Sequence, residues 1–245
     1  MLGARAADGL APANCHTRRL AAAQSLRAWL LGGLRPAFHV GLLFRAMSGA
    51  LPLLTWLVLS GLLDQPTPAT VTFPVRCSVA LDPTGKAVAS EEWLNGELGA
   101  AQNLFAPFGV AFASTPGVSL DAAAAHVETR ADRDGLAPHV VPHVIDVFVV
   151  DSIRDVDDPA QMRRGVHWHA PTGAHYIILV ASAPTTVLAH ELGHYFGNPH
   201  RHMVDNVMSY ERSGGHVFFD ADQGKRIVSR AAAYVRSGEL LPVTR

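Results

Sequence analysis

Three histidines and one glycine constrain the fold of this chain most strongly. His190 and His194 are four residues apart, so on an α-helix both imidazoles lie on one face, one turn apart. Gly197 follows where a glycine in the left-handed conformation can end a helix, and Pro199 prevents the helix from resuming. We expect the resulting turn to bring His200 back toward the other two rings.

Three converging imidazoles would form a metal site. Neutral imidazole is a good ligand for Zn²⁺, and a catalytic zinc ion keeps one coordination position for water. Glu191 directly follows the first histidine, so its carboxylate can approach that water without binding the ion, as a general base requires. His202 also lies near and could replace His200, although the spacing after Gly197 favours His200. The alternative is a set of surface or core histidines that bind no metal.

The segment contains an eleven-residue motif, H-E-x-x-H-x-x-G-x-x-H. It is filled by His190, Glu191, His194, Gly197 and His200. This motif resembles that of the metzincin zinc endopeptidases, in which the three histidines bind zinc and the glutamate is the general base. The resemblance is firm over residues 185–212 and loose over the rest of residues 70–240, and it implies Zn²⁺ as the cofactor.

The residues after the third histidine extend this resemblance. Metzincins have a methionine turn beneath the metal, and Met208 in "DNVMSYE" matches it. Tyr210 resembles a tyrosine of the astacin, serralysin and pappalysin-like branches, which approaches the zinc and helps to stabilise the oxyanion. The pappalysin-like branch is the most similar. The alternatives are ordinary packing for Met208 and a core aromatic for Tyr210.

The chain divides into three parts. Residues 1–46 carry six arginines against Asp8 alone, and residues 47–63 form a run of 17 residues without a charge. We predict a basic, poorly ordered leader at 1–46, a hydrophobic signal or anchor segment with a linker at 47–69, and a catalytic domain at 70–245. The catalytic domain would then be secreted, or anchored to a membrane through residues 47–63 and held outside the cytoplasm. A buried core helix is the alternative for that run.

Composition and charge exclude some classes of protein. Residues 70–245 carry more acidic than basic side chains, so we expect no nucleic-acid partner. The two cysteines, Cys15 and Cys77, lie on either side of the hydrophobic run. This placement excludes a disulfide framework and argues against a cysteine zinc site.

From residue 70 onward the hydrophobic pattern is that of a mixed domain. The predicted strands are 70–81, 110–114, 143–153 and a pair within 165–183 around a turn at 171–173. The predicted helices are 90–109, the histidine-bearing segment and 220–238, with Ser90 and either Asp220 or Asp222 near the starts and Gly238 past the last end. We therefore predict an α/β (α+β) fold with a twisted mixed sheet, an active-site helix and a C-terminal helix. The resemblance implies a metzincin-like zincin domain.

Two further features leave alternatives open. His167 and His169 alternate, so on a strand they face one side, and His175 follows in the same hairpin. This second histidine group is either a second metal site or a set of exposed polar residues. Asp205 could bond to a ligand histidine or cap the turn before Met208.

The resemblance implies hydrolysis of peptide bonds in a peptide or protein substrate. Glu191 would be the general base, and zinc with Tyr210 would hold the oxyanion. The strand in "AHYIILVA", residues 174–181, resembles the antiparallel edge strand that aligns an extended substrate in this family. The alternatives are a zinc-binding module without turnover and a zinc hydrolase that acts on a non-peptide amide.

Overall fold

The structure is a computed structural model that describes residues 70–243. The predicted leader at 1–46 and the hydrophobic segment at 47–69 lie outside the described residues. Within the described part, none of the helices has both the length and the apolar character needed to cross a membrane.

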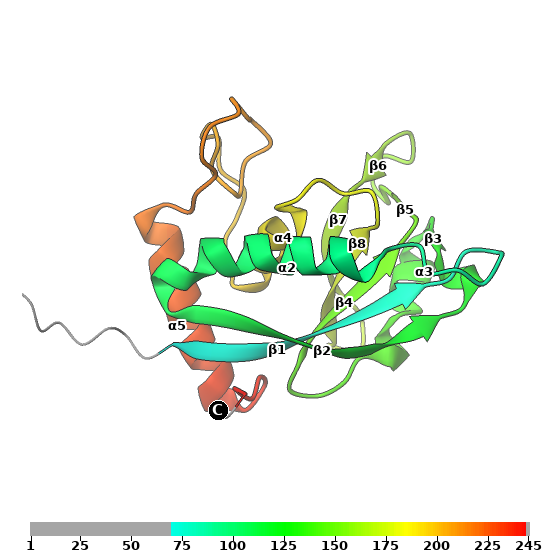
Figure 1. The fold of residues 1–245 in the computed structure, drawn as a ribbon, viewed down its shortest axis with the longest axis horizontal. Helices are drawn as coiled ribbons and strands as arrows, with labels where there is room; N and C mark the ends of the chain where they lie inside the picture. Colours follow the sequence, from blue (N-terminus) through cyan, green and yellow to red (C-terminus); the bar gives the residue numbers. More distant parts are fainter. Residues whose placement is uncertain (1–69, 244–245) are drawn as a thin grey trace, which may run out of the picture. The chain divides into compact units, whose positions relative to one another are not determined.

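A twisted five-stranded mixed sheet forms the centre of the described residues (Figure 1). Its strands, in spatial order, are β2 (Val110–Leu120), β1 (Val71–Ala80), β4 (Ile145–Val150), β8 (His175–Val180) and β7 (Gly165–His169). The first four run parallel to one another, and β7 is antiparallel to β8. Every residue of β4 is buried, as expected for the middle strand of a sheet that is covered on both faces. The mixed α/β architecture is the one that the sequence predicts.

Strand β8 corrects one expectation. We expected residues 174–181 to form an antiparallel edge strand, but β8 lies inside the sheet, hydrogen-bonded to β4 on one side and β7 on the other. Five of its six residues are buried, because the strand is covered on both faces. The antiparallel edge strand is β7, whose residues are partly exposed.

The two faces of the sheet contact two separate cores, because successive side chains of a strand point to opposite faces. Val147 and Val149 of β4 belong to the larger core, whereas Phe148 and Val150 belong to the smaller one. The larger core contains residues of α2 (Glu91–Phe105), α4 (Val187–Tyr195) and α5 (Ala221–Ser237). Helices α2 and α4 contact each other on this face of the sheet (Figure 1).

The smaller core lies under the short elements of the other face. These elements are β3 (His126–Val127), β5 (Ser152–Arg154) and β6 (Met162–Arg163), which form a three-stranded sheet, and α3 (Arg130–Asp134). Three 3₁₀ helices complete the described elements, namely η1 (Ala106–Phe108), η2 (Ala122–Ala124) and η3 (Ala137–His139).

Helices α2 and α5 begin at the residues that the sequence indicates. The Ser90 hydroxyl accepts a hydrogen bond from the main-chain N–H of Trp93 at 3.2 Å. Asp220, rather than Asp222, caps α5, and Gly238 ends that helix with a φ of 73°. Each such N-cap stabilises its helix by about 1 kcal/mol.

Helix α4 begins differently, because its N-terminus is capped from another helix. Thr186 precedes it with a φ of 102° and makes no side-chain cap. Instead, the buried carboxylate of Glu97, from α2, accepts a hydrogen bond from the main-chain N–H of Leu188 at 3.2 Å. Burial raises the pKa of Glu97 to about 7. The start of the histidine-bearing helix therefore depends on an ionisable group of α2.

Candidate metal centre

Helix α4 ends in the turn that the sequence predicts. Gly197 has a φ of 83°, a left-handed conformation that costs glycine little. Its N–H donates to the carbonyl of His194 at 2.8 Å, and the N–H of Asn198 donates to the carbonyl of Gly193 at 2.9 Å. These two bonds satisfy the last carbonyl groups of the helix, and the chain then turns back through Pro199.

The turn brings His200 to the two histidines of α4. Nε2 of His200 lies 3.3 Å from Nε2 of His190 and 3.1 Å from Nε2 of His194. Nitrogen ligands at the Zn–N distance of a tetrahedral site are about 3.3 Å apart. The spacing and chemistry of these donors therefore fit a zinc ion. His202, the alternative ligand, is exposed and does not belong to this triad.

Main-chain carbonyls orient the two rings of α4. Nδ1 of His190 donates to the carbonyl of Val207 at 2.7 Å, and Nδ1 of His194 donates to the carbonyl of Asn198 at 2.8 Å. A proton on Nδ1 leaves Nε2 with a free lone pair, which is the form that binds a metal. Burial lowers the pKa of His190, and it lowers that of His194 to about 4. Both rings are therefore neutral near pH 7.

Asp205 takes neither of its two expected roles, because Asn206 caps the turn by accepting a hydrogen bond from the main-chain N–H of Met208 at 3.0 Å. Its carboxylate accepts hydrogen bonds from the main-chain N–H of Ser213, at 2.8 Å, and from the Ser213 hydroxyl. Asp205 itself has a φ of 59°. It therefore holds the loop around Met208, whereas carbonyl groups orient the histidines.

Met208 lies directly against α4. Its side chain is fully buried, and a Cβ atom added to Gly193 would lie 2.3 Å from its Sδ. The main-chain N–H of Arg201 donates to the carbonyl of Met208 at 2.8 Å. The residue after the third histidine is therefore bonded directly to the methionine that packs against α4. The sequence argument missed the role of Gly193, although a glycine inside a helix is a recognised sign of close packing.

Glu191 is buried beside the triad. Its carboxylate does not belong to the group of ligand atoms formed by the three histidines. The main-chain N–H of His167, on β7, donates a hydrogen bond to it. Burial raises the pKa of Glu191 to about 8, although that hydrogen bond and the positive charge of Arg163 both act to lower it.

Tyr210 is not a core aromatic, because 70% of the residue is exposed. Its hydroxyl lies 2.9 Å from Nε2 of His200. Its ring lies 5.0 Å from that of His200 and 5.7 Å from that of His190, measured between centroids. The hydroxyl therefore lies beside one of the nitrogen atoms that would hold a metal.

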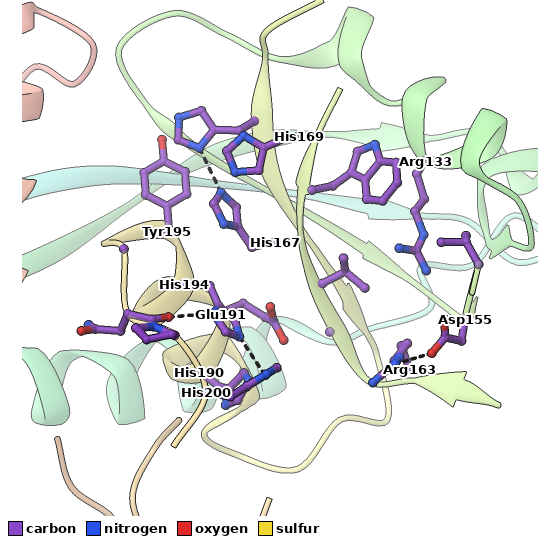
Figure 2. A pocket seen from close by; sticks show the side chains of 18 of the residues that line it. Arg133, Asp155, Arg163, His167, His169, His190, Glu191, His194, Tyr195 and His200 are labelled. Carbon is purple, nitrogen blue, oxygen red and sulfur yellow. Dashed lines mark hydrogen bonds and ion pairs between the residues drawn. The ribbon is translucent and has the colours of Figure 1, made fainter. Parts of the chain in front are cut away.

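A cavity of about 820 Å³ contains these groups. Figure 2 shows the triad and Glu191 on one side of it and Arg163, paired with Asp155, on another. Arg163 lies on β6, a two-residue strand of the small sheet. Sequence reasoning missed Arg163, because nothing in a two-residue strand indicates which cavity it lines.

The second histidine group lines the same cavity. His167, His169 and His175 each offer one ring nitrogen, and these three atoms lie within 4.8 Å of one another. His167 and His175 are only partly exposed, and burial lowers the pKa of His167 to about 2. The structure thus brings together a second triad that is able to hold a metal ion.

No family model matches this sequence, and no curated protein matches it. Among solved structures, the chain is similar to metalloproteinase-II from Bacteroides fragilis, with 15% sequence identity and a TM-score of 0.46. The match covers 67% of this chain and 55% of that protein, so the chain spans about half the length of the structure it resembles.

Proposed function

We propose that this chain is a zinc-dependent endopeptidase, a metalloprotease that hydrolyses peptide bonds. One observation carries the proposal. Nε2 of His200 lies 3.1–3.3 Å from Nε2 of His190 and His194, and a buried carboxylate that is not part of the triad lies in the same cavity. The motif supports assignment to the metzincins, with the pappalysin-like branch the most similar.

His190, His194 and His200 would hold the ion. When bound, zinc lowers the pKa of a coordinated water and polarises the scissile carbonyl. Glu191 then takes a proton from the attacking water and passes it to the leaving amine. Without the ion, burial raises the pKa of this carboxyl group, and the positive charge of a bound ion would favour the carboxylate form that accepts a proton.

Tyr210 would act on the developing oxyanion. Its hydroxyl lies 2.9 Å from Nε2 of His200, and a phenol O–H at that place can donate to an oxygen atom held nearby. Because the residue is largely exposed, the side chain has room to move as a substrate enters.

The edge strand β7 would align the substrate. The carbonyl of Arg164 and the N–H of Ala170 form hydrogen bonds on the side of β7 that faces β8. In an antiparallel pair the direction of the main-chain groups alternates, so Gly165 and His169 direct theirs to the open edge, whereas the N–H of His167, on the same side, is donated to Glu191. An extended peptide could add to the sheet through those groups.

The proposal also includes a cellular setting. If residues 47–63 act as a signal or anchor, the domain works outside the cytoplasm on peptide or protein substrates, either secreted or tethered to a membrane. The acidic balance of residues 70–245 supports the absence of a nucleic-acid partner.

The test uses the full chain and a proteome-derived peptide library, with cleavage products identified by mass spectrometry. We expect cleavage that stops when a chelator removes the metal. Glu191→Gln should keep the metal and lower cleavage about 10²- to 10⁴-fold, the usual contribution of a general base. Glu211→Gln, which changes an exposed carboxylate nearby, is the matched control and should cleave normally. Bound zinc without cleavage of any peptide would instead indicate a binding module.

A further inference from the structure

The second histidine group has geometry of its own. Nε2 of His167 lies 3.0 Å from Nδ1 of His175. The ring of His169 stacks on that of His175, with centroids 5.2 Å apart and planes at 8°, and its centroid lies 4.5 Å from that of His167. Figure 2 shows His167 and His169 on one wall of the cavity, next to Tyr195. Three imidazoles from one hairpin therefore gather at one point.

A carboxylate selects the tautomer of the central ring. Nε2 of His175 lies 2.7 Å from Oε1 of Glu239, in the segment that follows α5. The ring donates its Nε2–H to this oxygen, which leaves Nδ1 with a lone pair that points toward His167. A histidine that binds a metal usually donates its other N–H to a carboxylate or carbonyl in this way.

We propose that His167, His169 and His175 form a second metal site, for a divalent transition metal such as Zn²⁺, with Glu239 as the outer partner of His175. Imidazole donors suit Zn²⁺, Cu²⁺ or Ni²⁺, whereas Ca²⁺ and Mg²⁺ require oxygen ligands. A simple hydrogen bond from His167 to His175 would explain two of the rings. That hydrogen bond does not explain why His169 also lies beside both rings.

The site would join three parts of the fold. Its ligands lie on β7 and at the start of β8, and Glu239 ties it to the end of α5. The Tyr195 ring stacks on His175, with centroids 4.3 Å apart and planes at 20°, and Tyr195 directly follows His194 in α4. The main chain of His167 also donates to Glu191. A metal here would therefore fix the edge strand against the carboxylate of the first site.

The experiment counts metal ions. The full chain is stripped of metal and titrated with Zn²⁺ alone by calorimetry, and bound metal is then measured by mass spectrometry. We expect two equivalents for the wild-type chain. His169→Ala should remove one equivalent and His200→Ala the other. Glu239→Gln should lower the zinc affinity of the second site alone, by about 10- to 100-fold, as loss of an outer carboxylate usually does.

His126→Ala, which replaces an exposed histidine outside both groups, is the matched control and should keep both equivalents. Because His169 is itself exposed, its replacement should not unfold the chain, and circular dichroism checks this. Co²⁺ absorption gives a second measurement, in which one set of bands should disappear with His169→Ala and a different set with His200→Ala. A single equivalent in the wild-type chain, or two equivalents of unchanged affinity in His169→Ala, would overturn the proposal. Neither result depends on whether the chain cleaves peptides.

Discussion

Gly165 on the edge strand faces Glu191 on α4 so closely that a Cβ at this position would overlap the glutamate side chain. A Cβ atom added to Gly165 would lie 2.8 Å from Cγ of Glu191 and 2.9 Å from its Oε1. The φ of Gly165 is not positive, so the requirement for glycine is steric rather than conformational. The proposed general base thus packs against β7 at two places. It contacts the backbone of Gly165, where no Cβ intervenes, and it accepts a hydrogen bond from the main-chain N–H of His167.

Gly165→Ala should therefore lower activity without removing the metal. The added methyl group would also lie 2.8 Å from Cγ1 of Val187, so it must displace both the Glu191 and Val187 side chains or β7 itself. A misplacement of about 1 Å can lower the rate about 100-fold. The first triad does not touch this position, so its zinc content should stay at the wild-type value. Peptide cleavage and metal analysis on the same preparation measure both effects.

A matched control comes from α2. Gly99 has open space where its Cβ would lie, and alanine favours a helix, so Gly99→Ala should keep full activity and gain slight stability. If Gly165→Ala cleaved peptides as fast as Gly99→Ala, Glu191 would not need its present position.

His200→Ala and His202→Ala should differ in zinc affinity. His200 contributes Nε2 to the triad, whereas His202 is exposed outside it. Loss of a direct ligand should weaken zinc binding at this site by more than about 100-fold, the upper value for loss of an outer partner. His202→Ala should leave it unchanged. Competition with a chromophoric chelator measures both variants, and the reverse order would make His202 the third ligand.

The local motif predicted the convergence of the three histidines because the geometry is set by neighbours in the chain. A spacing of four residues on a helix, a glycine that ends it and a proline after it determine where His190, His194 and His200 meet. The caps of α2 and α5 were predictable for the same reason, since Ser90, Asp220 and Gly238 act within one turn of their own helix.

Contacts between distant segments could not be predicted in this way. Glu97 caps α4 from 91 residues away, and Gly165 acts through its approach to Glu191. Strand order also depends on the whole sheet, and β7 separates β8 from the edge at which the resemblance predicts it. The apolar sequence of β8 shows only that the strand is buried, which suits an interior strand better than an edge.

Tyr210→Phe should lower kcat more than it changes KM. The hydroxyl lies beside Nε2 of His200 but is not a metal ligand in the proposal, so zinc should remain bound. Removal of one donor to an oxyanion costs about 100-fold in kcat or more. Steady-state kinetics on one identified peptide separates the two constants. A change in KM alone would make Tyr210 a substrate contact instead.

Glu97 should make the stability of the chain depend on pH. Its folded pKa of about 7 is raised from the ordinary value of 4.5 by burial, so the folded state favours the protonated form. The stabilisation is complete below about pH 4.5 and is lost as the pH rises through 7. Each pKa unit is worth about 1.4 kcal/mol, so the loss reaches about 3 kcal/mol.

Glu97→Gln should remove this contribution, because the amide oxygen can still accept the Leu188 hydrogen bond but carries no proton that titrates. Urea unfolding of metal-free protein from pH 4.5 to 8 gives the free energy of unfolding, and we expect the wild-type value to fall relative to that of the variant as the pH rises. The buried histidines titrate in both proteins, so their contribution cancels in the difference. Glu92→Gln, at an exposed position of the same helix, should follow the wild-type curve. Parallel curves for wild type and Glu97→Gln would show that the carboxyl group is ionised in the folded protein over this whole range, and that α4 is capped by a charge.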